Sequence, residues 1–223
     1  ALWATYYGGT EVDILTTVQI DKNDDLYFGG RTGSTASIST AGSYQPAYNG
    51  VGPTNADAML VKFNPAGARI WGTYLGGAVL SPAFPGLARD PTTYITGLGV
   101  GPNNEIVAVG DSYTSDFPVT SCAYQTQFNG VENQFISTFS SDGDLICSSL
   151  LGLGGNTEHN ETPWLVTGES VATDGGFAYL TGHSPCTYPT TPGSFQPACA
   201  GGLNDGFVAQ ICLTTCGVTD TTS

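Results

Sequence analysis

Short apolar runs alternate with small and polar residues along the whole chain. In the first part of the chain these runs occupy residues 14–20, 26–30, 58–63 and 68–76, and Gly, Asn, Asp and Pro bound them. Runs of this length, rich in Val, Ile, Tyr, Phe and Thr, are typical of β-strands. No stretch has the 3.6-residue periodicity of an amphipathic helix. We therefore expect an all-β protein.

The pattern of apolar runs occurs three times. LWATYYGG, IWGTYLGG and ICSSLLGLGG end successive blocks, and DLYFGG, EIVAVG and FAYLTG recur in step with them. YQPAYNG, YQTQFNG and FQPACAGG form a third series. A period of about seventy residues indicates a repeated unit that buries its apolar surface against its neighbours. We divide the single domain, residues 1–223, into units at approximately 10–77, 78–155 and 156–223, with residues 1–9 left as an orphan closing strand.

Each unit has two tight connections and two long ones. In the first unit the tight connections are residues 21–25 and 64–67, which carry the polar residues of hairpin turns. Four antiparallel strands per unit predict the blades of a β-propeller, three in number. The connection after the Gly-Gly pair varies most, from residues 10–13 to 78–93 and 156–163, and such variation marks a binding or assembly surface.

The ordered motifs resemble a known repeat. W-x-T-Y-x-G-G, L/V-Y-x-x-G, a segment such as TTPGSFQPACAGG and then D-x-F-V-A resemble the bacterial seven-bladed β-propeller repeat, from Leu2 to about Leu213. The resemblance implies four-stranded blades around an axis and attaches no chemistry to them. The end of the chain departs most from the motifs, because Cys147 replaces the Trp in the third copy of W-x-T-Y-x-G-G and residues 216–223 are too polar for a convincing closing strand.

Three blades form an incomplete ring, since propellers have about four to eight. More of a longer polypeptide, further chains or an open array would complete it, and a start within a motif favours a processed or truncated chain. Residues 2–9, with Leu2, Trp3 and Tyr6, carry the side chains of a closing strand. We expect this assembly strand to pair with the third blade, in the same chain or, by preference, in a neighbouring chain, giving a homo-oligomeric ring or a filament.

Charge narrows the choice of partners. Five Lys and Arg residues stand against 19 Asp and Glu, for a net charge of −14. Such a surface repels phosphate backbones and anionic membranes, so we expect no nucleic-acid partner. No apolar run is long enough for a membrane-spanning helix, so we expect no membrane span. Few Lys residues beside abundant Thr, Ser, Gly, Tyr and Asn favour an extracellular or cell-surface location.

Six cysteines without metal-binding spacing indicate an oxidising compartment. Alignment of the repeats places two pairs across local loops and leaves a third pair by elimination. The alternative is that some are buried free thiols. The expected disulfides are Cys186–Cys199, Cys212–Cys216 and Cys122–Cys147.

Catalytic and metal-binding motifs are scarce. His159 and His183 belong to no HExxH motif and lie beside no GxSxG serine. We interpret His183 as a solvated residue at a strand end. Glu158, His159 and Glu161 could hold a cation, although a solvated loop is the better interpretation. We therefore expect no catalytic residue, no metal and no cofactor.

Two acidic patterns bear on metal binding and on catalysis. Asp21-x-Asn23-x-Asp25 resembles the start of a calcium loop, but no bidentate Glu follows at the required distance, and we interpret it as a turn. No spacing singles out two carboxylates for glycoside hydrolysis. The sequence Asn160-Glu161-Thr162 makes Asn160 a possible glycosylation site.

Aromatic residues recur at fixed positions of the repeat. Tyr44, Tyr124 and Phe195 share one position, and Tyr48 and Phe128 share another. Stacking on sugars would suit them, but packing within or between blades is favoured, since packing also produces recurrence.

The sequence thus predicts a secreted, non-catalytic β-propeller-repeat protein that serves as a structural or adhesive component of a cell-surface assembly or extracellular filament. The long-loop face or the open blade edges would make the contacts. The alternative is a lectin-like module that binds a glycan ligand, and the third hypothesis is a fragment of a glycan-active hydrolase.

Overall fold

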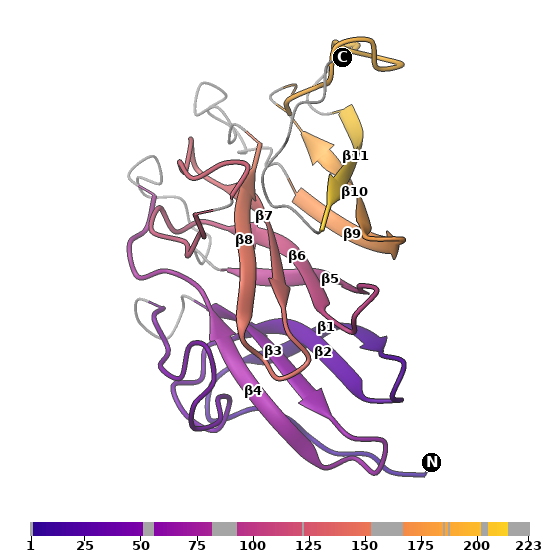
Figure 1. The fold of residues 1–223 in the computed structure, drawn as a ribbon. Helices are drawn as coiled ribbons and strands as arrows, with labels where there is room; N and C mark the ends of the chain where they lie inside the picture. Colours follow the sequence, from indigo (N-terminus) through magenta and orange to yellow (C-terminus); the bar gives the residue numbers. More distant parts are fainter. Residues whose placement is uncertain are drawn as a thin grey trace.

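The computed structural model describes residues 2–50, 56–81, 93–121, 123–152, 167–184, 186, 188–201 and 205–213. These residues form three antiparallel sheets and no helix, which confirms the predicted all-β fold of three sheets, not closed into a barrel. In each sheet the strands follow one another in chain order (Figure 1).

The first two sheets have the expected four strands. The first contains β1 (Asp13–Ile20), β2 (Leu26–Thr32), β3 (Asp57–Phe63) and β4 (Arg69–Leu75). The second contains β5 (Tyr94–Val100), β6 (Ile106–Ser112), β7 (Asn133–Phe139) and β8 (Leu145–Leu151). The third contains β9 (Thr167–Asp174), β10 (Phe177–Ser184) and β11 (Asp205–Cys212), one strand fewer within the described residues. β5 contacts both β1 and β9, as the inner strands of neighbouring blades do (Figure 1).

A bulge at one place in every sheet explains the glycine that ends the L/V-Y-x-x-G motif. The register between the first two strands shifts at Leu15/Thr17 in the first sheet and at Ile95/Gly97 in the second. A Cβ atom on Gly30 would collide with the carbonyl oxygen of Ile14, and Gly110 stands in the same relation to Tyr94. The bulge therefore requires a residue without a side chain.

Two apolar layers between the sheets form the core. The layer between the first and second sheets joins Tyr27, Leu60 and Trp71 to residues of the second sheet, among them Ile106 and Phe135. The other face of the second sheet packs against the third sheet through a set that includes Val107, Val109, Ile136, Ala178 and Leu180. The second sheet is thus buried on both faces, and the outer two have one inner face each.

A tryptophan contact joins the fourth strand of one sheet to the last turn of the next. The Nε1 atom of Trp71 in β4 donates to the carbonyl oxygen of Ser141, at 3.0 Å, in the turn between β7 and β8. Gly143 in that turn has a φ of +93°, and a Cβ atom there would meet the indole ring. The turn thus needs glycine both for its backbone conformation and for its contact with Trp71.

Residues 2–9 make the same contact one sheet earlier. Trp3 Nε1 donates to the carbonyl oxygen of Pro65, at 3.0 Å, and its ring lies against Gly67 in the turn between β3 and β4. The segment is not a strand, and its described contacts lie on the first sheet rather than on β11. It occupies the place that the fourth strand of a preceding sheet would take. The expected pairing with the third blade is therefore not formed within the described chain.

Replacing Trp71 and replacing Trp3, which make equivalent contacts, should destabilise the protein to different extents. Trp71→Ala should lower the free energy of unfolding by about 3–5 kcal/mol, because it opens a cavity between two sheets. Trp3→Ala should cost clearly less, because Trp3 is 37% exposed whereas Trp71 is 7% exposed. Urea denaturation of both variants would measure the difference. Equal losses would contradict the assignment of Trp71 to the inter-sheet core.

Candidate assembly surfaces

The long loop between the second and third strands holds the outer edge of the fourth strand. In the first sheet the backbone N–H of Thr40 donates to the carbonyl oxygen of Gly72, at 2.9 Å. Five residues along the loop, the carbonyl oxygen of Gln45 accepts from the N–H of Tyr74, at 3.2 Å. We call this pair of contacts the loop clamp. It satisfies backbone groups that an edge strand would otherwise leave open.

The second sheet has the same loop clamp. The N–H of Thr120 donates to the carbonyl oxygen of Ser148, at 3.0 Å, and the N–H of Leu150 donates to that of Gln125, at 3.1 Å. Gln45 and Gln125 are the Gln residues of the recurring YQPAYNG and YQTQFNG motifs. The motif thus specifies a loop that binds a fourth strand.

The third sheet has the loop of the clamp without a described fourth strand. The N–H of Ser194 donates to the carbonyl oxygen of Thr191, at 3.1 Å, which reproduces the turn that follows Thr40. The hydroxyl of Thr190 donates to the carbonyl oxygen of Pro197, at 2.8 Å, as Ser39 does to Pro46. Gln196 stands where the motif places Gln45, and it is exposed. The loop therefore keeps the clamp conformation.

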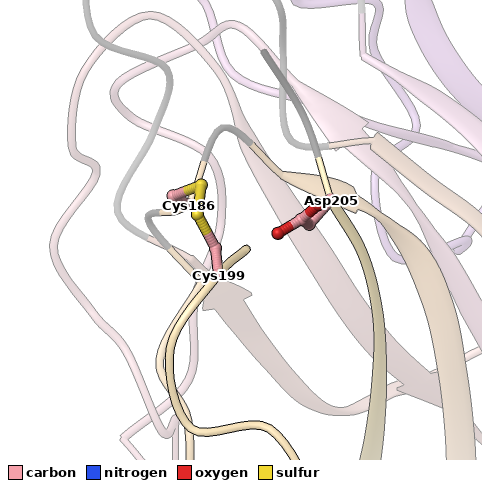
Figure 2. A group of neighbouring side chains, drawn as sticks. All are labelled: Cys186, Cys199 and Asp205. Carbon is pink, nitrogen blue, oxygen red and sulfur yellow. A yellow bond between two sulfur atoms is a disulfide. The ribbon is translucent and has the colours of Figure 1, made fainter. Parts of the chain in front are cut away.

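A disulfide closes this third loop. Cys186 and Cys199 are bonded, which confirms that predicted pair, and their Cα atoms are 5.5 Å apart (Figure 2). In the chain-entropy model a loop of this size contributes about 3 kcal/mol. The carboxylate of Asp205 lies beside the two sulfur atoms and accepts from the N–H of Ala200, at 2.7 Å. Thiolate, not disulfide, sulfur binds metals, so this group is not a metal site while the bond is intact.

The other predicted disulfides involve residues outside the described part of the chain. Cys147 is disulfide-bonded, but its predicted partner Cys122 is not described. Cys216 is likewise outside the described residues, so its pairing with Cys212 stays a prediction.

Apolar side chains are exposed at both outer faces of the three-sheet stack. Val18 in β1 is 56% exposed, whereas Leu98, at the same position of β5, is 5% exposed beneath the first sheet. At the other end Val208 in β11 is 84% exposed, while its equivalents Leu60 and Ile136 are 0% and 6% exposed. The two outer faces thus carry residues that are buried wherever a neighbouring sheet is present.

The turn at residues 21–25 is structural, as interpreted from the sequence. The carboxylate of Asp21 accepts from the N–H of Asn23, at 2.8 Å, from that of Asp25, at 3.0 Å, and from the hydroxyl of Tyr27, at 3.1 Å. Lys62 pairs with Asp25 at 2.9 Å. The Asp21 side chain thus holds the backbone of the turn, and Asp25 ties the turn to β3.

A hollow of about 440 Å³ lies where the short turns of the three sheets meet. It is lined by residues 20–22, 100–102 and 173–175. Lys22 donates to the carbonyl oxygen of Pro102, at 2.5 Å, and Thr173 donates to that of Val100, at 2.6 Å. These bonds link neighbouring turns, so the polar groups of the hollow serve contacts between sheets.

Three of the four recurring aromatic residues in the first two repeats pack against the sheets, and the fourth, Tyr124, is 49% exposed. Tyr44 lies edge-on against Phe139 of the second sheet, with ring centroids 5.9 Å apart, and so crosses from one sheet to the next. Tyr48 packs on Tyr74, at 5.8 Å, and Phe128 packs against the core between the first two sheets. The expected packing role is confirmed for these three. Phe195 in the third repeat is fully exposed.

Burial sets the charge state of one carboxylate under the first loop clamp. Burial raises the pKa of Asp57 to about 6, although hydrogen bonds from the backbone of Asn49 and Gly50 and from the Gln45 side chain partly oppose the rise. The second sheet has Asn133 at this position, where it accepts from the N–H of Asn129 at 2.9 Å.

Sequence reasoning missed a pair of buried carboxylates, Asp111 in β6 and Glu132 just before β7. Both are 0% exposed, and both help to raise the pKa of Tyr94, after the larger effect of burial. No motif or regular spacing in the sequence indicates that these two carboxylates are buried. Neither residue lines the described hollow.

Several candidate residues lie outside the described part of the chain. They are Glu158, His159, Asn160 and Glu161. His183 is described near the end of β10, half-buried and opposite Gly206 of β11. Among the described residues no helix is long and apolar enough to cross a membrane.

Comparison with protein-family models and with curated proteins finds no match to the chain. The resemblance to the bacterial β-propeller repeat therefore stays a prediction.

The raised pKa of Asp57 predicts how the stability of the protein depends on pH. The folded-state pKa of Asp57, about 6, lies above its ordinary value of 3.8, so the folded protein binds this proton more tightly. The associated stability is complete below about pH 4 and is lost as the pH rises through about 6. Asp57→Asn, which copies Asn133, should flatten this part of the curve.

Urea denaturation between pH 4 and 7 would measure the effect. The reverse substitution, Asn133→Asp, places a carboxylate at a buried position and should steepen the same part of the curve. An unchanged slope in Asp57→Asn would contradict the raised pKa.

Proposed function

We propose that the protein is a non-catalytic structural component of a secreted or cell-surface assembly, and that its outer sheet faces make the contacts. The exposure of Val208 carries this proposal, because side chains at the same position of the other two sheets are buried between sheets. An apolar face of this kind costs free energy in water and is stabilised when another sheet covers it.

The charge of the protein and its apolar outer faces together favour specific contact over non-specific association. The net charge of −14 keeps copies apart at long range, and apolar contact acts only when two faces meet in register. Added salt screens the repulsion, so association should strengthen as the salt concentration rises.

An extracellular setting fits the covalent structure. The disulfide between Cys186 and Cys199 is of a kind that persists in oxidising compartments. A component of a cell wall, appendage or adhesive filament would work in such surroundings.

Self-association tests the proposal. Val208→Asp should weaken association measured by sedimentation velocity and light scattering over a range of protein concentrations, because it puts a charge on the outer face. Ile146→Asp is the matched control: Ile146 is exposed on β8 although that sheet has neighbours on both faces, so this variant should associate like the parent. Equal effects of the two substitutions would contradict the proposal, as would a parent protein that stays monomeric throughout.

The exposed ring of Phe195 supports a second candidate, a glycan-binding module. A glycan array separates the two functions. Specific binding that disappears in Phe195→Ala would favour the lectin-like function, and the absence of binding would favour the structural one.

A further inference from the structure

The third sheet and residues 2–9 are complementary halves of one structural unit. β11 pairs only with β10 among the described strands, and the loop at residues 188–201 already has the clamp conformation. Residues 2–9 lie in the place of a fourth strand, but no described strand pairs with them. In the first and second sheets, the loop clamp joins the fourth strand to the rest of the sheet.

The segment matches the fourth strand of the first sheet residue by residue. Trp3 corresponds to Trp71, and both indoles donate to the turn of the following sheet. Tyr6 therefore corresponds to Tyr74, which is buried under its own loop. Tyr6 is fully exposed. Among the described residues, no sheet covers the Tyr6 side chain.

We propose that residues 2–9 of one copy form the fourth strand of the third sheet of a second copy, and that two copies close a six-bladed ring. This inference rests on the proposed structural function and specifies the partner and the contact. In the ring each copy donates one strand and receives one. The two joints are identical by two-fold symmetry.

The receiving groups follow from the loop clamp of the first two sheets. Tyr6 of the donor takes the place of Tyr74, so its N–H donates to the carbonyl oxygen of Gln196. Ala4 takes the place of Gly72, so its carbonyl oxygen accepts from the N–H of Thr191. The disulfide between Cys186 and Cys199 holds this loop in position for both bonds.

The same joint covers the two exposed outer faces. With residues 2–9 in place, the first sheet of the donor packs on the third sheet of the receiver, as the second sheet packs on the first. Val208 is then buried against the donor, as Leu60 is buried against the second sheet. Val18 of the donor gains the cover that Leu98 has.

The number of blades favours closure with two copies. Rings of about four to eight blades are known. The described residues form three sheets. Two such sets give six blades, whereas one set or three sets fall outside that range. A closed ring also leaves no edge strand at the joints.

An engineered disulfide tests the joint. Leu60 and Thr73 are direct partners in the ladder of β3 and β4, so the equivalent residues Val208 and Thr5 should be direct partners between copies. Direct partners in a ladder lie within reach of a disulfide. Both residues are exposed, so the double variant T5C/V208C should fold like the parent.

Mild oxidation of T5C/V208C should give a covalent dimer as the main product on a non-reducing gel, with the linked peptide identified by mass spectrometry. The control A4C/V208C should give little of it, because the side chain of the residue next to Thr5 points to the opposite face of the strand. Deleting residues 2–9 should leave a monomer.

The other outcomes separate the inference from the proposed function. A ladder of covalent oligomers would overturn the closed ring, and a link within one chain would overturn the second copy as partner. A dimer by light scattering that gives no link would overturn strand donation while the structural function stands. A monomer at every concentration would overturn both.

Discussion

The structure depends on the burial of sheet faces against other sheets. A four-stranded sheet with apolar side chains on both faces cannot cover them by itself, so each sheet is stabilised by its neighbours. The second sheet has both neighbours and is the most deeply buried part of the chain: every residue of β6 and β7 is buried. The strand β1 at one end and the strand β11 at the other are correspondingly exposed.

The contacts between sheets are made by a few recurring elements. A tryptophan on a fourth strand reaches the turn of the next sheet, a tyrosine of the long loop crosses to the next sheet, and the loop clamp holds the fourth strand from outside. Each element joins two units, so a unit at the end of the stack keeps only half of its contacts. The outer face of the first sheet and the outer face of the third sheet are complementary because each carries one half of the same repeated contact.

The sequence predicted the sheets well because strand periodicity and turn residues are local signals. It predicted the disulfide between Cys186 and Cys199 because both cysteines lie in one loop of the repeat. The burial of Asp111 and Glu132 could not be predicted in this way, since it depends on how distant segments cover the second sheet. The position of residues 2–9 was also missed: alignment predicted a closing strand, but not that Trp3 and Tyr7 would hold the segment on the first sheet.

The cross-linked loop of the third sheet differs from its two equivalents in what keeps it in shape. The loops of the first and second sheets are ordered partly by the strands that they hold, whereas the third has its shape without a described strand. A loop that is preorganised loses less conformational entropy when a strand arrives, and more of the contact energy then remains for affinity. The bond between Cys186 and Cys199 therefore constrains the loop in the absence of a described fourth strand, and a reducing environment would remove this constraint.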